Sequence, residues 1–120
     1  MSRSVLIVDD DPSFLSLATR ILAQAGFEVV ATAEDAAGAV SAANATKPDA
    51  ALVDVGLPDR EGVDLAYELA ELPWRPRVVL TSTDSDAGFA LDVFDGRPRL
   101  PFIAKADLAN GQLASLLTSR

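Results

Sequence analysis

Carboxylate side chains stand at the ends of two apolar runs in this sequence. Asp9 and Asp10 come directly after residues 5–8, and Asp54 ends the run that starts at residue 50. Carboxylates that share one crevice repel each other unless a proton or a metal ion lies between them. The chain has neither histidine nor cysteine, so its metal ligands would be oxygen atoms. Oxygen ligands favour a hard ion such as Mg²⁺.

The candidate metal ligands are not equivalent. Asp10 and Asp54 are the best side-chain ligands, Asp9 is next, and the carbonyl of Gly56 could complete the set. The alternative is that the acidic residues after the first run cap the following helix and interact with its dipole. We assign Asp11 mostly to that capping role and Asp10 mostly to the metal. Taken alone, Asp54 would be explained more simply as the start of a turn.

A hydroxyl and an amine follow two later apolar runs. Thr81 lies near the end of residues 77–82, and Lys105 follows residues 101–104. The alternative for Lys105 is a solvated surface lysine. A carboxylate, a cation, a hydroxyl and a lysine at one edge describe a phosphoryl-transfer site instead. Asp54 would be the nucleophile towards phosphorus, while Mg²⁺ and the lysine neutralise the phosphoryl oxygens.

The scaffold that must bring these residues together is an alternation of strands and helices. Strands are expected at residues 5–8, 27–31, 50–54, 77–82 and 101–104. Helices are expected in five places. The first runs from Pro12 to Gly26 with Phe14 and Leu17 inward, and the second follows a capping box at residues 32–35. The others are expected over 61–72, near 87–94 and at the C-terminal end. This pattern implies a single doubly wound, five-stranded parallel sheet with strand order 2-1-3-4-5. The acidic residues after strands 1 and 3 would then share one crevice.

Length, charge and composition exclude several functional classes. The 120 residues suffice for one domain, which we place at 1–120, and 49% apolar residues is typical of a globular protein. A net charge of -8 argues against a nucleic-acid or anionic-membrane surface. Histidine-dependent triads, disulfides and the usual zinc sites are impossible. No apolar run approaches the roughly 20 residues of a membrane span, and residues 1–4 leave no room for a signal peptide. A cytoplasmic protein is expected.

Four segments carry a family resemblance. They are Val5–Pro12, Leu52–Gly62, Val78–Ser82 and Phe102–Lys105. In this order and at these separations, the chain resembles the receiver domain of two-component response regulators over essentially its whole length. The resemblance implies the receiver fold, which is flavodoxin-like, and a role in phosphorelay signal transduction.

The resemblance also implies roles for individual residues. Asp54 would accept a phosphoryl group from a phosphohistidine on a sensor histidine kinase or a histidine phosphotransfer protein. Asp9 and Asp10 would organise Mg²⁺, and Lys105 and Thr81 would contact the phosphoryl oxygens. Such a domain is not an enzyme in the ordinary sense, because it catalyses only its own phosphorylation and dephosphorylation.

Phosphorylation in the family changes an output face. The resemblance implies that Thr81 moves towards the phosphate and that Phe102 turns inward, which alters the surface of helix 4, strand 5 and helix 5. It allows a homodimer through that face, and it implies no direct nucleic-acid contact by this domain and no membrane contact. The sequence leaves open the cognate kinase and whether an output domain belongs to the protein.

The sequence departs from the family pattern in several places. Ala106 replaces the proline that usually follows the lysine, which is expected to loosen this loop. Phe102 lacks the hydroxyl of a tyrosine, and residues 84–100 are atypical for helix 4. Gly56 and Thr83 occupy positions that tune dephosphorylation in the family. Because Gly56 has no side chain to obstruct attacking water, the phosphorylated state is expected not to be unusually long-lived.

Three other functions fit the sequence less well than phosphoryl acceptance. A receiver-like module that binds partners without phosphorylation would be favoured by a missing acid, lysine or hydroxyl, and none is missing. A phosphatase with an aspartate nucleophile is disfavoured, because Asp54 is followed by Val55 and Gly56 and the chain has no cap-domain insertion. Flavin binding is disfavoured, because no phosphate-binding loop follows the first strand.

Overall fold

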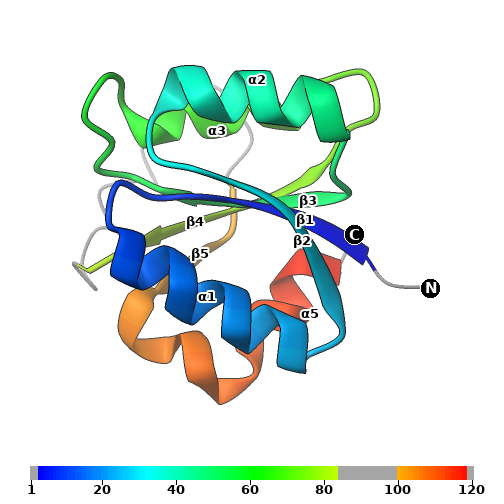
Figure 1. Ribbon diagram of the computed structural model, residues 1–120, viewed down its shortest axis with the longest axis vertical. Coiled ribbons are helices and arrows are strands. Elements are labelled where there is room, and N and C mark those ends of the chain that lie inside the picture. The colour runs from blue at the N-terminus through cyan, green and yellow to red at the C-terminus, as the bar shows by residue number, and fades with distance from the viewer. Residues whose placement is uncertain (1–2, 84–99, 119–120) are drawn as a thin grey trace.

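The computed structural model describes residues 3–83 and 100–118, which form a five-stranded sheet with helices on both faces (Figure 1). The strands are β1 (Arg3–Val8), β2 (Phe27–Ala33), β3 (Ala50–Asp54), β4 (Arg77–Ser82) and β5 (Phe102–Ala104). The helices are α1 (Pro12–Gln24), α2 (Ala36–Thr46), α3 (Gly62–Ala70), the 3₁₀ helix η1 (Lys105–Asn110) and α5 (Gln112–Thr118). All strand pairs are parallel, in the order β2-β1-β3-β4-β5. The predicted fold class and strand order are therefore confirmed.

Strand β3 is the buried centre of the sheet. All five of its residues are buried, and helices α2 and α3 cover one face of the sheet while α1 and α5 cover the other (Figure 1). Successive side chains of a strand point to opposite faces. Ala51 and Val53 thus belong to the core under α2 and α3, and Ala50 and Leu52 belong to the core under α1 and α5. Packing on both sides fixes the position of Asp54 at the end of this strand.

Helix α1 begins directly behind the first acidic cluster. The side chain of Asp11 accepts a hydrogen bond from the amide of Ser13 at 3.0 Å, so Asp11 is the N-cap, as predicted. The helix ends before Gly26, whose φ of +95° suits a glycine. The predicted inward position of Leu17 was wrong. Leu17 is 48% exposed, and Leu15 is buried instead.

The start of helix α2 differs from the prediction. No capping box forms with Thr32, because β2 continues to Ala33 and pairs there with Val8 of β1. The N-cap is Asp35, whose side chain accepts a hydrogen bond from the amide of Gly38 at 2.7 Å. The short side chain of an N-cap residue reaches the amide three positions later, and for this helix that geometry is met by Asp35 and not by Thr32.

The remaining boundaries lie close to the predicted ones. Strand β4 has the predicted bounds, β5 begins one residue late, and α3 is shorter than the predicted 61–72. The predicted helix near residues 87–94 lies outside the described residues. No described helix combines the length and apolar character that crossing a membrane requires.

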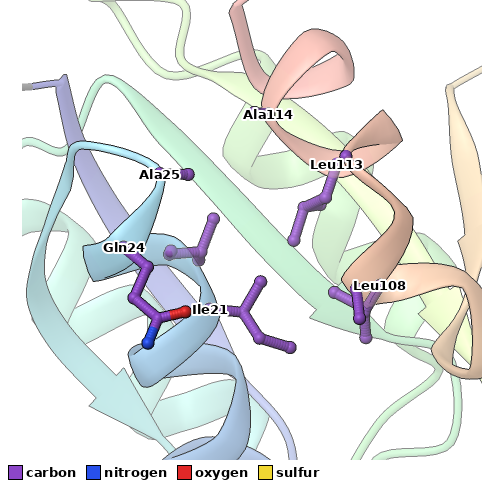
Figure 2. Close-up of a pocket in the computed structure, with 9 residues that line it drawn as sticks. Ile21, Gln24, Ala25, Leu108, Leu113 and Ala114 are labelled. Carbon is purple, nitrogen blue, oxygen red and sulfur yellow. The ribbon is translucent and has the colours of Figure 1, made fainter.

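A groove of about 280 Å³ lies between the last turn of α1 and the segment from η1 to α5 (Figure 2). Its lining is mainly aliphatic and includes Ile21, Leu108 and Leu113. Helix α1 starts beside the acidic residues and runs away from them, so the groove belongs to the other end of this helix. It is not part of the candidate site.

Candidate functional site

The parallel sheet brings the predicted site residues to one rim. Asp54 is the last residue of β3 and pairs with Thr81 of β4, and Asp9 directly follows β1. Lys105 directly follows β5, the neighbour of β4. Because parallel strands end at the same edge of a sheet, residues from four strands meet there.

Three carboxylates form a compact cluster at this rim. Asp9, Asp10 and Asp54 each offer a carboxylate oxygen, and these oxygens all lie within 4.8 Å of one another. Asp9 and Asp54 are 0% and 7% exposed, whereas Asp10 is exposed. Closely spaced anions require a neutralising partner. The all-oxygen donor set and the exposed edge at Asp10 fit a hard divalent ion that keeps some of its water.

Asp9 is fully buried, and its two oxygens have different partners. Oδ1 accepts a hydrogen bond from the amide of Asp11 at 2.9 Å. Oδ2 forms an ion pair with Nζ of Lys105 at 2.5 Å. The buried charge is therefore compensated within the protein, as a buried carboxylate requires.

The ammonium of Lys105 lies among three side chains. It is 2.5 Å from Oδ2 of Asp9, 3.5 Å from Oδ1 of Asp54 and 4.2 Å from the centre of the Phe14 ring. Burial opposes its charge, but the hydrogen bond to Asp9 and the charges of both carboxylates outweigh burial and raise the pKa of Lys105. The side chain is thus a permanent cation within reach of Asp54.

Burial is the main reason why the pKa of Asp54 is raised, and repulsion from Asp9 adds to it. The charge of Lys105 and the amide of Gly56, which donates to Oδ2 at 3.2 Å, act in the opposite direction. A carboxylate with a raised pKa is more basic, and therefore more nucleophilic, than an ordinary aspartate once it is ionised.

The hydroxyl of Thr81 is an unused donor beside this cluster. In the described part of the chain its Oγ1 is buried without a hydrogen-bond partner. Buried hydroxyl groups normally have a partner. The position of Thr81, opposite Asp54 in the strand ladder, suggests that its partner arrives at Asp54. The role of the Gly56 carbonyl as a metal ligand stays a prediction.

Gly62 is a site residue that sequence reasoning missed. A Cβ atom at this position would lie 2.0 Å from the carbonyl oxygen of Asp54 and 2.6 Å from Cα of Val55. The amide of Gly62 donates to the carbonyl of Val55 at 3.1 Å, which closes the loop after β3. A glycine at the start of a predicted helix, where it is a poor helix former, is the signal that could have identified it.

Asp59 is a second missed residue, and it connects the same loop to helix α2. Its carboxylate accepts hydrogen bonds from the amides of Ala36 at 2.9 Å and Ala37 at 3.2 Å. These two hydrogen bonds, chiefly the one from Ala36, lower the pKa of Asp59. The loop after Asp54 is thus bound to a neighbouring helix. Nothing in the local sequence around Asp59 indicates this contact.

A single doubly wound sheet with this strand order and an acid-lined carboxyl rim defines the class of flavodoxin-like α/β domains. Within that class, the family model of the response regulator receiver domain matches residues 5–98. The chain belongs to this family.

Curated relatives agree with this assignment. The chain is 36% identical over 83 residues to the probable transcriptional regulatory protein TcrX of Mycobacterium tuberculosis, covering 68% of this chain and 35% of that protein. It is 38% identical over 125 residues to protein-glutamate methylesterase/protein-glutamine glutaminase 2 of Anaeromyxobacter dehalogenans, covering 97% and 34%. The chain thus spans about a third of the length of these relatives. The chemotaxis protein CheY of Bacillus subtilis is similar over nearly its full length, with 28% identity and coverage of 97% and 96%.

Solved structures show the same fold. A LuxR-family two-component response regulator from Aurantimonas gives a TM-score of 0.78 at 25% identity and covers 100% of this chain and 89% of that one. The response regulator domain of Thermotoga maritima CheB gives a TM-score of 0.77 at 24% identity, with coverage of 97% and 94%.

Proposed function

We propose that residues 1–120 form a receiver domain that accepts a phosphoryl group on Asp54 in a Mg²⁺-dependent reaction. The observation that supports this most directly is the position of Lys105, whose Nζ lies 3.5 Å from the carboxylate of Asp54 within a three-carboxylate cluster. A permanent cation beside a basic carboxylate is what the attack of an aspartate on a phosphoryl group requires.

The proposed step uses Asp54, Lys105 and Thr81 of this chain, a phosphohistidine donor and the divalent metal ion described below. An oxygen of Asp54 attacks phosphorus, the new P–O bond forms as the donor's P–N bond breaks, and the released imidazole takes a proton from solvent. Lys105 neutralises a phosphoryl oxygen, and the hydroxyl of Thr81 donates to another, which would give this buried hydroxyl the partner that it lacks. Attack of water on phosphorus later releases inorganic phosphate and restores the carboxylate.

The charges in the cluster support a divalent metal ion. When all three carboxylates are ionised, the ammonium of Lys105 neutralises one charge and leaves two. Asp9, Asp10 and Asp54, together with the carbonyl of Gly56, would hold the ion. Bound there, Mg²⁺ supplies positive charge to the phosphoryl oxygens in the transition state.

A phosphoryl group at Asp54 would also act as a conformational switch. It adds a charge of about -1.5 to -2 together with new acceptor oxygens, so it stabilises conformations in which Thr81 and Lys105 are close to it. Lys105 begins η1 directly after β5, and Phe102 begins β5. Contacts to the phosphoryl group would therefore change the conformation of the proposed output face. Helix 4 of this face lies outside the described residues.

The partners follow from the same chemistry. Receiver domains interact with histidine kinases or histidine phosphotransfer proteins, and we propose one of these as the phosphodonor here. A homodimer through the output face, the absence of nucleic-acid and membrane contacts and a cytoplasmic location remain part of the proposal. The net charge of -8 supports the absence of contacts with anionic surfaces.

Mass spectrometry after incubation with a small phosphodonor tests the proposal. A gain of one phosphoryl group is expected with Mg²⁺, and no gain after the metal is removed by a chelator. Asp54→Ala should abolish the gain, and Asp107→Asn, which changes an exposed carboxylate outside the cluster, should leave it intact. If the wild-type protein remains unmodified with Mg²⁺ and donor, a binding module that works without phosphorylation is the better description.

A further inference from the structure

Phe14 lies where the ring of its side chain faces the ammonium of Lys105. The Nζ atom is 4.2 Å from the ring centre, well inside the roughly 6 Å over which a cation and an aromatic ring attract each other. We propose that Phe14 is a positioning residue that holds Lys105 for phosphoryl transfer. This inference rests on the proposed role of Lys105 at Asp54.

The fold brings the ring and the ammonium together from opposite ends of the chain. Phe14 lies in the first turn of α1, behind the N-cap Asp11, and is 7% exposed. Lys105 is the first residue of η1. Phe14 packs in the core that also contains Ile103 of β5 and Leu108 of η1. The ring and the segment around Lys105 therefore belong to one core.

A lysine at this position needs such a neighbour. Its four-carbon side chain is flexible and loses much rotamer entropy when it is fixed. If only the carboxylates held the ammonium of Lys105, it would pair mainly with Asp9, whose oxygen is 2.5 Å away, because Asp54 is farther away at 3.5 Å. The ring attracts the cation but accepts no conventional hydrogen bond from it. It thus confines the ammonium beside both carboxylates and leaves its N–H donors available for phosphoryl oxygens.

The loosening of the loop after β5 by Ala106 stays a prediction, and the backbone of this segment has a defined shape. Lys105 and Ala106 are part of the regular turn of η1. With the backbone in place, the remaining freedom of Lys105 lies in its side chain, which is 16% exposed. The face of Phe14 limits that freedom.

Graded fluorination of Phe14 tests the attraction with little change in the shape of the ring. Fluorine withdraws electron density from the ring face, so mono-, di- and trifluorophenylalanine weaken the attraction in steps. We expect the phosphorylation rate with a small phosphodonor and saturating Mg²⁺ to fall in the same order, to about one fifth for the trifluoro variant. This change corresponds to about 1 kcal/mol, the size expected for a cation–π contact.

Phe27 provides the matched control. It is a phenylalanine of the same core, 8% exposed, and it begins β2 opposite Arg3, at the end of the sheet away from Asp54. The same fluorinated series at Phe27 should leave the rate unchanged. A trifluoro variant at position 14 that reacts as fast as the wild type overturns the inference while the proposed function stands.

An NMR measurement tests the placement without any phosphorylation. Protons above the face of an aromatic ring are shifted upfield, so the ε-methylene protons of Lys105 should be shifted in the wild type and return to ordinary values in Phe14→Leu. Ordinary values in the wild type overturn the inference. A wild type that shows the upfield shift but gains no phosphoryl group contradicts the proposed function and leaves the contact between Phe14 and Lys105 in place.

Discussion

Lys105 is held more closely by Asp9 than by Asp54. Its Nζ lies 2.5 Å from Oδ2 of Asp9 and 3.5 Å from Oδ1 of Asp54. Lys105 therefore mainly compensates the charge of the fully buried Asp9. It lies beside the proposed nucleophile Asp54 but pairs less closely with it. Asp9, Asp10 and Asp54 would together hold a metal ion, whose charge would take over part of the compensation that Lys105 gives to Asp9.

Replacing the lysine should destabilise the metal-free protein. Lys105→Met keeps the length of the side chain but leaves the buried carboxylate of Asp9 without its cation. Loss of one partner of a buried pair is costly, and we expect a decrease of about 2 kcal/mol in the free energy of unfolding, because the ammonium is partly exposed. Urea denaturation without and with Mg²⁺ measures the effect. The metal should recover part of the loss, and an equal loss in both buffers would contradict this explanation.

Neutralising the proposed phosphoacceptor should have the opposite effect on stability. Burial and repulsion from Asp9 raise the pKa of Asp54. An acid whose pKa is higher in the folded state than in the unfolded state destabilises the fold at pH values above its unfolded pKa. Asp54→Asn is thus expected to raise the free energy of unfolding at neutral pH without metal, by an amount on the order of 1 kcal/mol.

The control for Asp54→Asn is the same comparison in Mg²⁺. A bound ion neutralises the cluster in the wild type, so the advantage of the variant should shrink as the metal concentration rises. A lower denaturation midpoint for the variant in metal-free buffer would show that repulsion does not dominate the cluster.

The loop after β3 should tolerate a methyl group at one glycine and not at the other. Gly62→Ala places Cβ 2.0 Å from the carbonyl oxygen of Asp54, so the backbone that carries the nucleophile must move. We expect a loss of about 3 kcal/mol or more and a strongly reduced phosphorylation rate. Gly56→Ala is the matched control, because its Cβ would meet only Oδ2 of Asp54 at 3.6 Å. Equal stabilities of the two variants, measured by thermal denaturation, would count against the steric argument.

Asp59 should make the stability depend on pH in a defined direction. The hydrogen bonds from the first amides of α2 lower its pKa from the ordinary 3.8. An acid with a lowered pKa stabilises the fold fully above its unfolded pKa and loses this contribution as the pH falls through the folded value. The difference in unfolding free energy between wild type and Asp59→Ala should therefore be constant near neutrality and decrease below about pH 4.

Urea denaturation of both proteins at a series of acidic pH values measures this difference. Asp59→Asn, which keeps an oxygen acceptor for the amides of α2, separates the hydrogen bonds from the charge. A difference between wild type and Asp59→Ala that does not change with pH would mean that the pKa of Asp59 is the same in the folded and unfolded states.

The phosphorylated form should decay at an ordinary rate for an aspartyl phosphate. Gly56 has no side chain, and only Oδ2 of Asp54 lies within 4 Å of the place where its Cβ would be. Water can therefore approach phosphorus from this side. The loss of the phosphoryl mass after removal of the donor gives the half-life, and a half-life of many days at neutral pH would refute the expectation.

The sequence predicted the sheet better than the helix faces. Short apolar runs that end in aspartate, threonine or lysine define parallel strands and their common rim almost without ambiguity. The face of α1 was harder to predict, since a 3.6-residue period fits Leu17 as well as Leu15 with Phe14 and Ala18. Contacts with the rest of the sheet decide between them, and these contacts are not local.

The same distinction applies to the site. The positions of the acids, the hydroxyl and the lysine could be predicted because each lies at or just after the carboxyl end of a strand, and the strand order places these ends together. Gly62, Asp59 and Phe14 could not, because their importance comes from contacts with Asp54, Ala36 and Lys105 across the fold. The pairing of Lys105 mainly with Asp9 is likewise a matter of side-chain distance rather than of strand order.

The site joins the two ends of the described chain. Asp9 follows the first strand, and Lys105 follows the last one. During synthesis a growing chain can place its acids on the rim early, but the compensating ammonium arrives only when the fifth strand has left the ribosome and docked. Until then the carboxylates lack the ammonium of Lys105, so the proposed phosphoryl acceptance would begin only once the domain is complete.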